Sequence, residues 1–120
     1  MRRTDYTKYS HVHTVQSLDY YYDALKTIGK FDQLYVFSDD ITWCKENIKV
    51  PKTTYVEGNT DVEDLWLMSM CNNHIIANSS FSWWGAWLSK SKKVIAPKCW
   101  FGISGPKDWN DIYCVDWIVL

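Results

Sequence analysis

Long apolar runs, a net basic charge and a metal-type cysteine pattern are all missing from this sequence. Its uninterrupted apolar stretches are only a few residues long, as at residues 75–77, whereas a helix that crosses a bilayer needs about 20. Lysine and arginine total 13 against 14 aspartate and glutamate residues, so no strong field steers the chain to a phosphate backbone. The sequence therefore predicts neither a membrane-spanning segment nor a nucleic-acid partner.

The 4 cysteines lie far apart without a Cys-x-x-Cys pair, and His11 and His13 have no cysteine partner at zinc spacing. Four cysteines could form two disulfides. However, Cys71 lies in an apolar helical stretch, where a buried free thiol is the commoner outcome. We expect reduced cysteines and no structural zinc. Because no charged stretch is followed by an apolar one, we also expect no signal peptide within this segment.

The composition fits one globular domain. With 120 residues, 47% of them hydrophobic, the chain has what a single packed core of that size requires. It also carries 8 tryptophans and 8 tyrosines, whose rings either pack in the core or stack on sugars and bases at a binding site. Core packing is the commoner use. We therefore treat residues 1–120 as a single domain.

Helical and strand patterns alternate along the chain. Apolar positions recur at helical spacing before Gly29, where a C-cap glycine belongs, and short β-branched and aromatic runs follow. We expect helices over residues 17–28, 39–47, 61–71 and 81–88, strands over 33–38, 53–56, 74–77, 93–96 and 116–120, and a loop over 102–110. This alternation predicts an α/β domain with a mainly parallel sheet covered by helices on both faces.

Ligands of open parallel sheets bind beyond the carboxyl ends of the strands, so the strand-to-helix junctions are the candidate functional segments. They are residues 2–6, 38–40, 61–64 and 78–84. Arg2 and Arg3 can present a guanidinium fork to a diphosphate, although on chemistry alone a solvated basic terminus is the commoner explanation of such a pair. Residues 78–82 put amides and hydroxyls at a helix N-terminus, which suits an anion such as pyrophosphate. Helix capping is the alternative for these serines.

The acidic and histidine candidates have simpler explanations beside the functional ones. Asp39 and Asp40 invite a metal interpretation, but carboxylates at a helix start are stabilised by the helix dipole without any metal. Asp64 lies in the first turn of the predicted helix over 61–71, which also begins with acidic residues. We predict that its carboxylate accepts hydrogen bonds from the edge of a guanine base. His11 and His13 would lie on one side of an extended segment, where surface or packing roles are commoner than catalysis. No general base is evident.

Three motifs, in this order and at suitable separations, resemble the α-1,2-fucosyltransferases, glycosyltransferase family 11. They are Arg-Arg-Thr-Asp-Tyr at residues 2–6, Phe-Ser-Asp-Asp-Ile-x-Trp-Cys-Lys at 37–45, and Asn-Ser-Ser-Phe-Ser-Trp-Trp-Gly-Ala-Trp-Leu at 78–88. The resemblance covers essentially the whole chain, and the last motif is highly specific. It implies the C-terminal, donor-binding half of a GT-B-like enzyme, with a Rossmann-like three-layer domain.

The resemblance also implies the roles of individual residues. Arg2 and Arg3 match a His-x-Arg-Arg-x-Asp-Tyr signature, in which the arginines bind the donor diphosphate and stabilise the departing GDP. Met1 stands before the arginines, so the histidine, the strand leading into it and an upstream domain are expected to lie outside this chain. The residues implied to bind the donor are Arg2, Arg3, Asp5, Asp64, Asn78, Ser79, Ser80, Phe81 and Ser82.

The implied reaction is inverting transfer of L-fucose from GDP-fucose to the 2-hydroxyl of a terminal galactose in a glycan. Arginines and helix amides would neutralise the charge on the leaving phosphate, so no metal ion and no other cofactor is expected. The alternatives are a fucosyltransferase of another linkage and a truncated remnant or sugar-binding module without transfer. The parent enzyme would be cytoplasmic if bacterial and associated with the Golgi membrane if eukaryotic.

Overall fold

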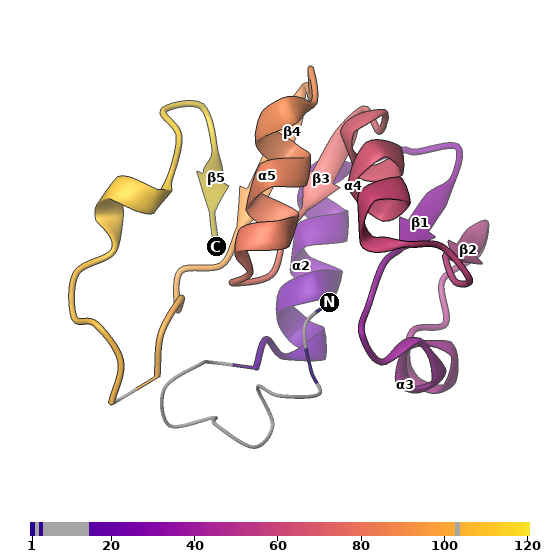
Figure 1. The fold of residues 1–120 in the computed structure, drawn as a ribbon, viewed down its shortest axis with the longest axis horizontal. Helices are drawn as coiled ribbons and strands as arrows, with labels where there is room; N and C mark the ends of the chain where they lie inside the picture. Colours follow the sequence, from indigo (N-terminus) through magenta and orange to yellow (C-terminus); the bar gives the residue numbers. More distant parts are fainter. Residues whose placement is uncertain (2, 4–14, 103) are drawn as a thin grey trace.

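The computed structural model describes residues 1, 3, 15–102 and 104–120. Helices and strands alternate through most of this part of the chain (Figure 1). The elements are α2 (Leu18–Ile28), β1 (Leu34–Val36), α3 (Ile41–Asn47), β2 (Thr53–Tyr55), α4 (Asp61–Ser69), β3 (Asn73–Ile75), α5 (Ser80–Leu88), β4 (Lys93–Ala96), a 3-10 turn at Asn110–Ile112 and β5 (Ile118–Val119). The predicted α/β class is confirmed.

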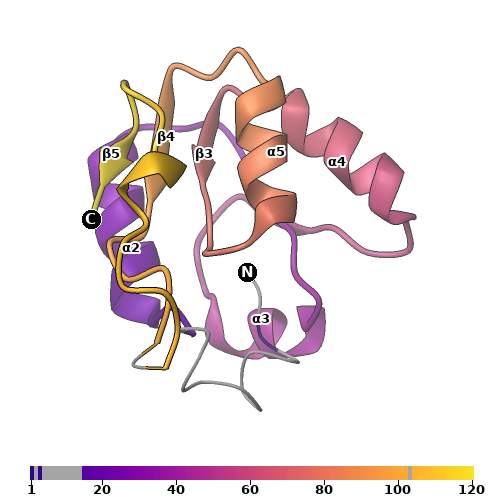
Figure 2. The same ribbon diagram turned by 60° about the vertical axis from the view of Figure 1, so that its left-hand side comes forward.

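The strands form two parallel sheets rather than the single sheet that the sequence predicted. β1 pairs with β2, and β4 lies between β3 and β5, each pair in parallel register. Helix α2 covers one face and helices α4 and α5 cover the other, which gives three layers (Figure 2). The arrangement is that of a Rossmann-like domain with a gap between its two half-sheets.

Local capping explains where the helices begin. Asp40 caps α3, with its carboxylate accepting a hydrogen bond from the Trp43 amide, so α3 starts at Ile41 rather than at residue 39. Thr60 and Glu63 form a reciprocal capping box at the start of α4. The expected helix over 61–71 ends at Ser69. The expected strand over 116–120 is shorter and comprises only Ile118–Val119.

Each half-sheet has its own hydrophobic core. Val36, Cys44 and Ile48 are buried between the two-stranded sheet and α3. A second core joins the three-stranded sheet, α5 and the C-terminal segment around Ile76, Ala86, Val94, Ala96 and Trp100. All four cysteines are free. Within the described residues no helix has the length and apolarity needed to span a bilayer.

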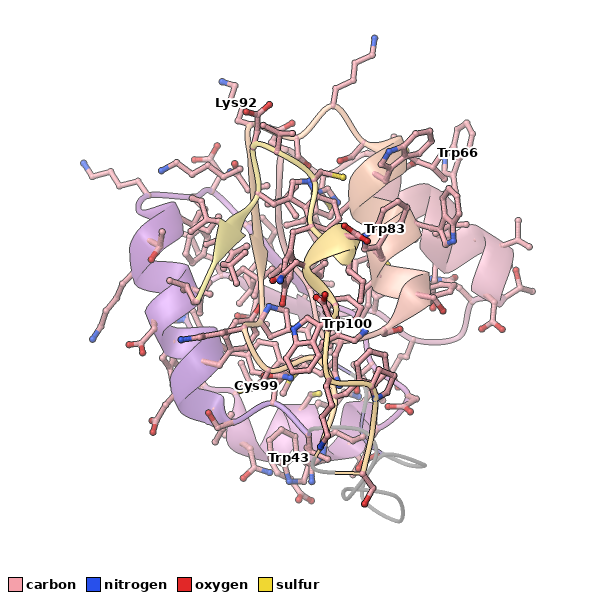
Figure 3. All side chains as sticks on the ribbon, turned by 90° about the vertical axis from the view of Figure 1, so that its left-hand side faces the viewer. Trp43, Trp66, Trp83, Lys92, Cys99 and Trp100 are labelled. Atoms are coloured by element: carbon pink, nitrogen blue, oxygen red, sulfur yellow. The ribbon has the colours of Figure 1, made fainter. Side chains whose placement is uncertain are left out.

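Aromatic residues differ in how deeply they are buried. Trp100 is 7% exposed and belongs to the core, and the indole N–H of Trp83 on α5 donates to the Ile112 carbonyl at 2.7 Å, which fastens the C-terminal segment to that helix. Trp66, by contrast, projects from the outer side of α4 (Figure 3) and is 69% exposed. The tryptophans on α4 and α5 therefore do not all pack inward.

Candidate functional site

A cavity of about 1070 Å³ lies between the two half-sheets, and its lining extends from residues that precede β1 and β3 to residues that follow β1, β2 and β3. We call the part at the carboxyl ends of the strands the mouth, which is formed by Phe37, Ser38, Asp39, Val56, Glu57, Asp64, Ala77, Ser79, Phe81 and Ser82. These residues follow β1, β2 and β3 or lie in the first turn of α4 or α5. The mouth is where a parallel α/β sheet binds its ligands.

The N-terminus of α5 faces this mouth without a side-chain cap. Ser79 is the N-cap residue, but its hydroxyl accepts no hydrogen bond from the first turn. The Ser82 hydroxyl lies 3.2 Å from the Ala77 carbonyl and 3.0 Å from the Ser79 carbonyl, to which it donates. The capping alternative for these serines therefore lacks its hydrogen bond. The first-turn amides of α5 keep the partial positive charge that favours an anion.

Asn78 is placed differently from the serines that follow it. Its side chain is 2% exposed, its amide N–H donates to the Trp100 carbonyl at 2.7 Å, and its carbonyl oxygen accepts from Gln16 at 3.3 Å. Gln16 also donates to the Cys99 carbonyl at 2.8 Å. Asn78 thus ties the β3–α5 turn to the segment after β4. Ser80 is exposed and does not line the cavity.

Asp64 lies at the mouth, in the first turn of α4. Its carboxylate accepts a hydrogen bond from the Asn59 side chain at 3.2 Å. Neighbouring Glu63 is used by the capping box, whose hydrogen bonds from Thr60 lower the pKa of the Glu63 carboxyl. Of the acidic residues that open this helix, Asp61 and Asp64 line the cavity and Glu63 does not.

Arg3 lies beside β1 and α3. Its backbone N–H donates to Asp39 at 2.9 Å, its guanidinium carbon lies 3.6 Å from the centre of the Trp43 ring, and its Nε is 3.7 Å from the Asp40 carboxylate. Trp43 lies at the opposite end of the molecule from Lys92, which precedes β4 (Figure 3). Arg3 is therefore at the carboxyl edge of the strands, although it does not line the cavity.

The remaining predicted residues Arg2 and Asp5, and the histidines His11 and His13, lie outside the described residues. Among the described residues no cluster of three histidine, cysteine, aspartate or glutamate side chains is suited to a metal ion. Inside the cavity, burial raises the pKa of the Tyr21 hydroxyl far above its ordinary value. Burial therefore favours the neutral hydroxyl of Tyr21 over its phenolate.

The sequence placed Ser38 in a candidate segment without giving it a role and did not select Glu57, and the structure places both at the mouth. Both residues follow strands, and this position is the feature of the sequence that could have indicated them as site residues. Ser38 bridges two segments, because its hydroxyl donates to the Met1 carbonyl at 2.8 Å and accepts from the Asp40 amide at 3.0 Å. Glu57 instead forms an ion pair with Lys45. Both contacts depend on distant parts of the chain.

The model of the family described as Glycosyl transferase family 11 matches residues 1–120. The chain belongs to glycosyltransferase family 11. Two curated relatives from Escherichia coli agree with this assignment: an alpha-1,2-colitosyltransferase with 42% identity and the O-antigen biosynthesis glycosyltransferase WbnK with 40%. Each alignment covers 84% of this chain, but only 39% and 37% of the respective relative. No solved structure gives a significant match.

The chain spans less than two fifths of the length of the curated relatives it matches. The mouth, with its uncapped helix N-terminus, is the described region with the chemistry to hold a sugar nucleotide by its phosphates.

Proposed function

We propose that this chain supplies the nucleotide-sugar site of an inverting α-1,2-fucosyltransferase, which transfers L-fucose from GDP-fucose to the 2-hydroxyl of a terminal galactose. The observation that carries the proposal is the uncapped N-terminus of α5 at the mouth. It is formed by the same residues, 78–82, that most closely resemble the α-1,2-fucosyltransferases. The α-1,2 linkage in the name of one relative supports the proposed linkage.

The reaction is a single displacement at the anomeric carbon of fucose. The galactose oxygen forms a bond to this carbon while the bond to the β-phosphate oxygen breaks, and GDP leaves with the bonding electrons. The hydroxyl proton passes to a base that we do not assign. Negative charge grows on the β-phosphate, so donors fixed around that oxygen lower the barrier. In this proposal Arg2, Arg3 and the first-turn amides of α5 are those donors.

Asp64 and Phe81 would contact the rest of the donor. Asp64 has a carboxylate at the mouth that can accept hydrogen bonds from the N–H groups of guanine. Phe81 presents an aromatic ring at the same opening. Asn78 would act by holding the turn that carries Ser79, because its side chain is already occupied by Gln16 and Trp100.

A second donor is favoured by one specific observation, the 42% identity to an alpha-1,2-colitosyltransferase. In this alternative the chemistry and the site are the same, and only the sugar differs. The experiment is a transfer assay with a longer version of the protein, extended to the length of its curated relatives. GDP-fucose and a colitosyl donor are compared on lactose and other galactosides, with the product linkage determined by NMR.

An α-1,2-linked fucosyl product with inverted anomeric configuration is the expected result. Preference for the colitosyl donor would replace the proposed sugar. A different linkage, or binding of GDP-fucose without transfer, would overturn the proposal in favour of the alternatives stated for the sequence. We also propose that activity is independent of metal ions, so that EDTA leaves turnover unchanged. A manganese or magnesium requirement restored by readdition would contradict metal independence.

A further inference from the structure

Helices α4 and α5 expose large apolar side chains on the outer layer of the molecule (Figure 2). Trp66 and Met70, one turn apart along α4, are 69% and 66% exposed. On α5, the side chains of Trp84, Trp87 and Leu88 are each about half exposed. We call these residues the outer patch. A gathered group of exposed apolar side chains marks a surface that binds a partner.

The two helices that carry the outer patch pack closely against each other. A Cβ atom at Gly85 would lie 3.0 Å from the Cε atom of Met68, so the missing side chain at this position lets α5 approach α4. Trp84 and Trp87 flank Gly85 in the sequence, and their ring centres are 5.6 Å apart in an edge-to-face arrangement. The exposed side chains of both helices therefore belong to one side of the molecule.

A basic turn borders the outer patch. Lys90 and Lys92 follow α5 directly and are exposed, and Lys92 lines a depression of about 260 Å³ together with Trp87. Asp116 is the acidic residue that lines this depression. Residues 65–107 contain lysines but neither aspartate nor glutamate. The surface thus combines exposed tryptophans with positive charge.

The chemistry of this surface favours a lipid partner over a glycan or a second protein. Tryptophan is enriched where a membrane meets water, because its ring is apolar and its N–H is polar. Lysine is attracted to anionic lipid headgroups. A glycan would need strong hydrogen-bonding groups beside the rings, which Met70 and Leu88 do not have. Protein interfaces are depleted in lysine, so a second copy of the chain fits this surface less well.

We propose that the outer patch, with Lys90 and Lys92, binds the surface of an anionic lipid bilayer. The indoles and Leu88 would lie at the boundary between headgroups and acyl chains, and the two ammonium groups would contact lipid phosphates. Lys92 and Trp66 both lie at the end of the molecule away from Trp43 (Figure 3), whereas the mouth lies at the first turn of α5. Binding would therefore leave the mouth uncovered. The proposal rests on this surface alone and holds whichever sugar is transferred.

The test is co-sedimentation of the 120-residue chain with two kinds of lipid vesicle. One kind is phosphatidylcholine alone, and the other contains equal parts of phosphatidylcholine and phosphatidylglycerol. At about 0.1 M salt we expect binding to the anionic vesicles to be roughly tenfold or more tighter than to the neutral ones. Raising the salt to about 1 M should remove most of this difference, because screening shortens the reach of the lysine charges.

Two double variants test the basic and the apolar parts of the surface separately. The pair Lys90→Gln and Lys92→Gln should weaken binding to anionic vesicles about tenfold and leave binding to neutral vesicles unchanged. The pair Trp66→Gln and Trp87→Gln should weaken binding to anionic vesicles by about tenfold as well, because less apolar surface enters the boundary region. All four positions are exposed, so the fold should be preserved.

The matched control is the pair Lys26→Gln and Lys49→Gln, which removes the same charge from exposed positions on α2 and after α3. It should change vesicle binding by less than about twofold, because the lost charges lie away from the proposed surface. Lys93 stays unchanged in every variant, since its ammonium group donates to the Thr27 carbonyl at 3.2 Å. Circular dichroism and melting temperature establish that each variant is folded.

The proposal is overturned if the parent chain binds neither kind of vesicle, or if the control pair weakens binding as much as the pair at Lys90 and Lys92. A version extended to the length of the curated relatives is measured in parallel and should bind anionic vesicles as well as the short chain does. Binding by the short chain alone would show that the rest of the protein covers the patch. In sedimentation velocity, a dimer that the tryptophan pair dissociates, without any vesicle binding, would assign the surface to self-association instead.

Discussion

At the scale of single residues, Arg3 contacts neighbouring side chains and is also the residue that the family resemblance implies to bind the donor diphosphate. Its guanidinium stacks on Trp43 and approaches Asp40, contacts that orient a flexible side chain and contribute about 1 kcal/mol. Its Nε is buried without a hydrogen-bond partner among the described residues. Stacking leaves the edge of the planar group available for phosphate oxygens.

The first prediction is that Arg3→Lys is nearly as damaging to turnover as Arg3→Ala in a longer version of the enzyme. Lysine keeps the charge but loses the two-point contact with phosphate oxygens and the stacking geometry. We expect turnover to fall on the order of 10²-fold in both variants, with folding preserved. Melting temperature, GDP affinity and turnover are measured together, with Asp40→Asn as the control that removes only the ion pair.

Near-normal turnover of Arg3→Lys would contradict the phosphate contact. A loss in Asp40→Asn as large as that in Arg3→Ala would assign Arg3 to the structure instead, as would unfolding of both Arg3 variants. The three variants thus separate binding of the donor from anchoring of the N-terminal segment.

The second prediction concerns His74, which is 6% exposed and lines the cavity from β3. Its ring contacts the Met68 carbonyl at 2.5 Å and the Ser91 hydroxyl, and burial lowers the pKa of the imidazole below its ordinary value of 6.5. Above pH 6.5 both folded and unfolded states hold it neutral. As pH falls below 6.5, the unfolded state binds a proton first, so stability decreases toward the lower pKa of the folded state.

Chemical denaturation between pH 7.5 and pH 5 checks this. The free energy of unfolding should decrease over that interval in the unmodified chain and decrease less in His74→Gln, which has no titrating ring. Parallel pH profiles for the two proteins would show that His74 carries no such linkage.

At the scale of elements, the third prediction separates Asn78 from the serines beside it. Asn78→Ala removes hydrogen bonds to Trp100 and Gln16 and leaves buried polar groups without partners. We expect a loss of about 2–3 kcal/mol in the free energy of unfolding, whereas Ser80→Ala, at an exposed position, should change it by less than about 0.5 kcal/mol. Denaturant titrations of the two variants measure the difference.

A role of Asn78 in direct donor binding would give the reverse pattern. Its alanine variant would then keep the stability of the parent chain and lose affinity for GDP, which isothermal titration of the longer enzyme would reveal.

The sequence predicted each element to within a few residues because local signals define them. The capping residues Asp40 and Thr60 and the terminal Gly29 act on neighbours within one turn, so their effects are readable along the chain. The separation into two half-sheets was not predicted, because strand pairing depends on contacts between distant residues. The same holds for Gln16, which bonds to Asn78 and Cys99 across 62 and 83 positions.

The candidate site was predictable to a similar degree. Position after a strand placed Asp64, Ser79, Phe81 and Ser82 near one another, and the structure brings all four to the mouth. The same rule could not distinguish Asn78 and Ser80 from their neighbours. In the structure Asn78 is buried and hydrogen-bonded, whereas Ser80 is exposed. Packing against the rest of the fold decides which side of a turn faces a cavity. The sequence of residues 78–82 alone does not contain this information.

At the scale of the whole molecule, the alignments cover 39% and 37% of the two curated relatives. A glycosyltransferase must also hold an acceptor hydroxyl near 3–3.5 Å from the anomeric carbon to react efficiently. In the function that we propose, the described residues bind the donor.

The last prediction is that the 120-residue chain alone shows no measurable transfer to lactose or other galactosides, whereas a version extended to the length of its curated relatives does. Without a fixed acceptor, the entropic advantage of a positioned displacement is lost, which is worth several orders of magnitude in rate. Radiolabelled GDP-fucose is incubated with both proteins, and circular dichroism establishes that the short chain is folded. GDP titration of the short chain then distinguishes a formed donor site from an absent one. Turnover by the pure short chain comparable to that of the longer protein would contradict this prediction and would place acceptor binding within these 120 residues.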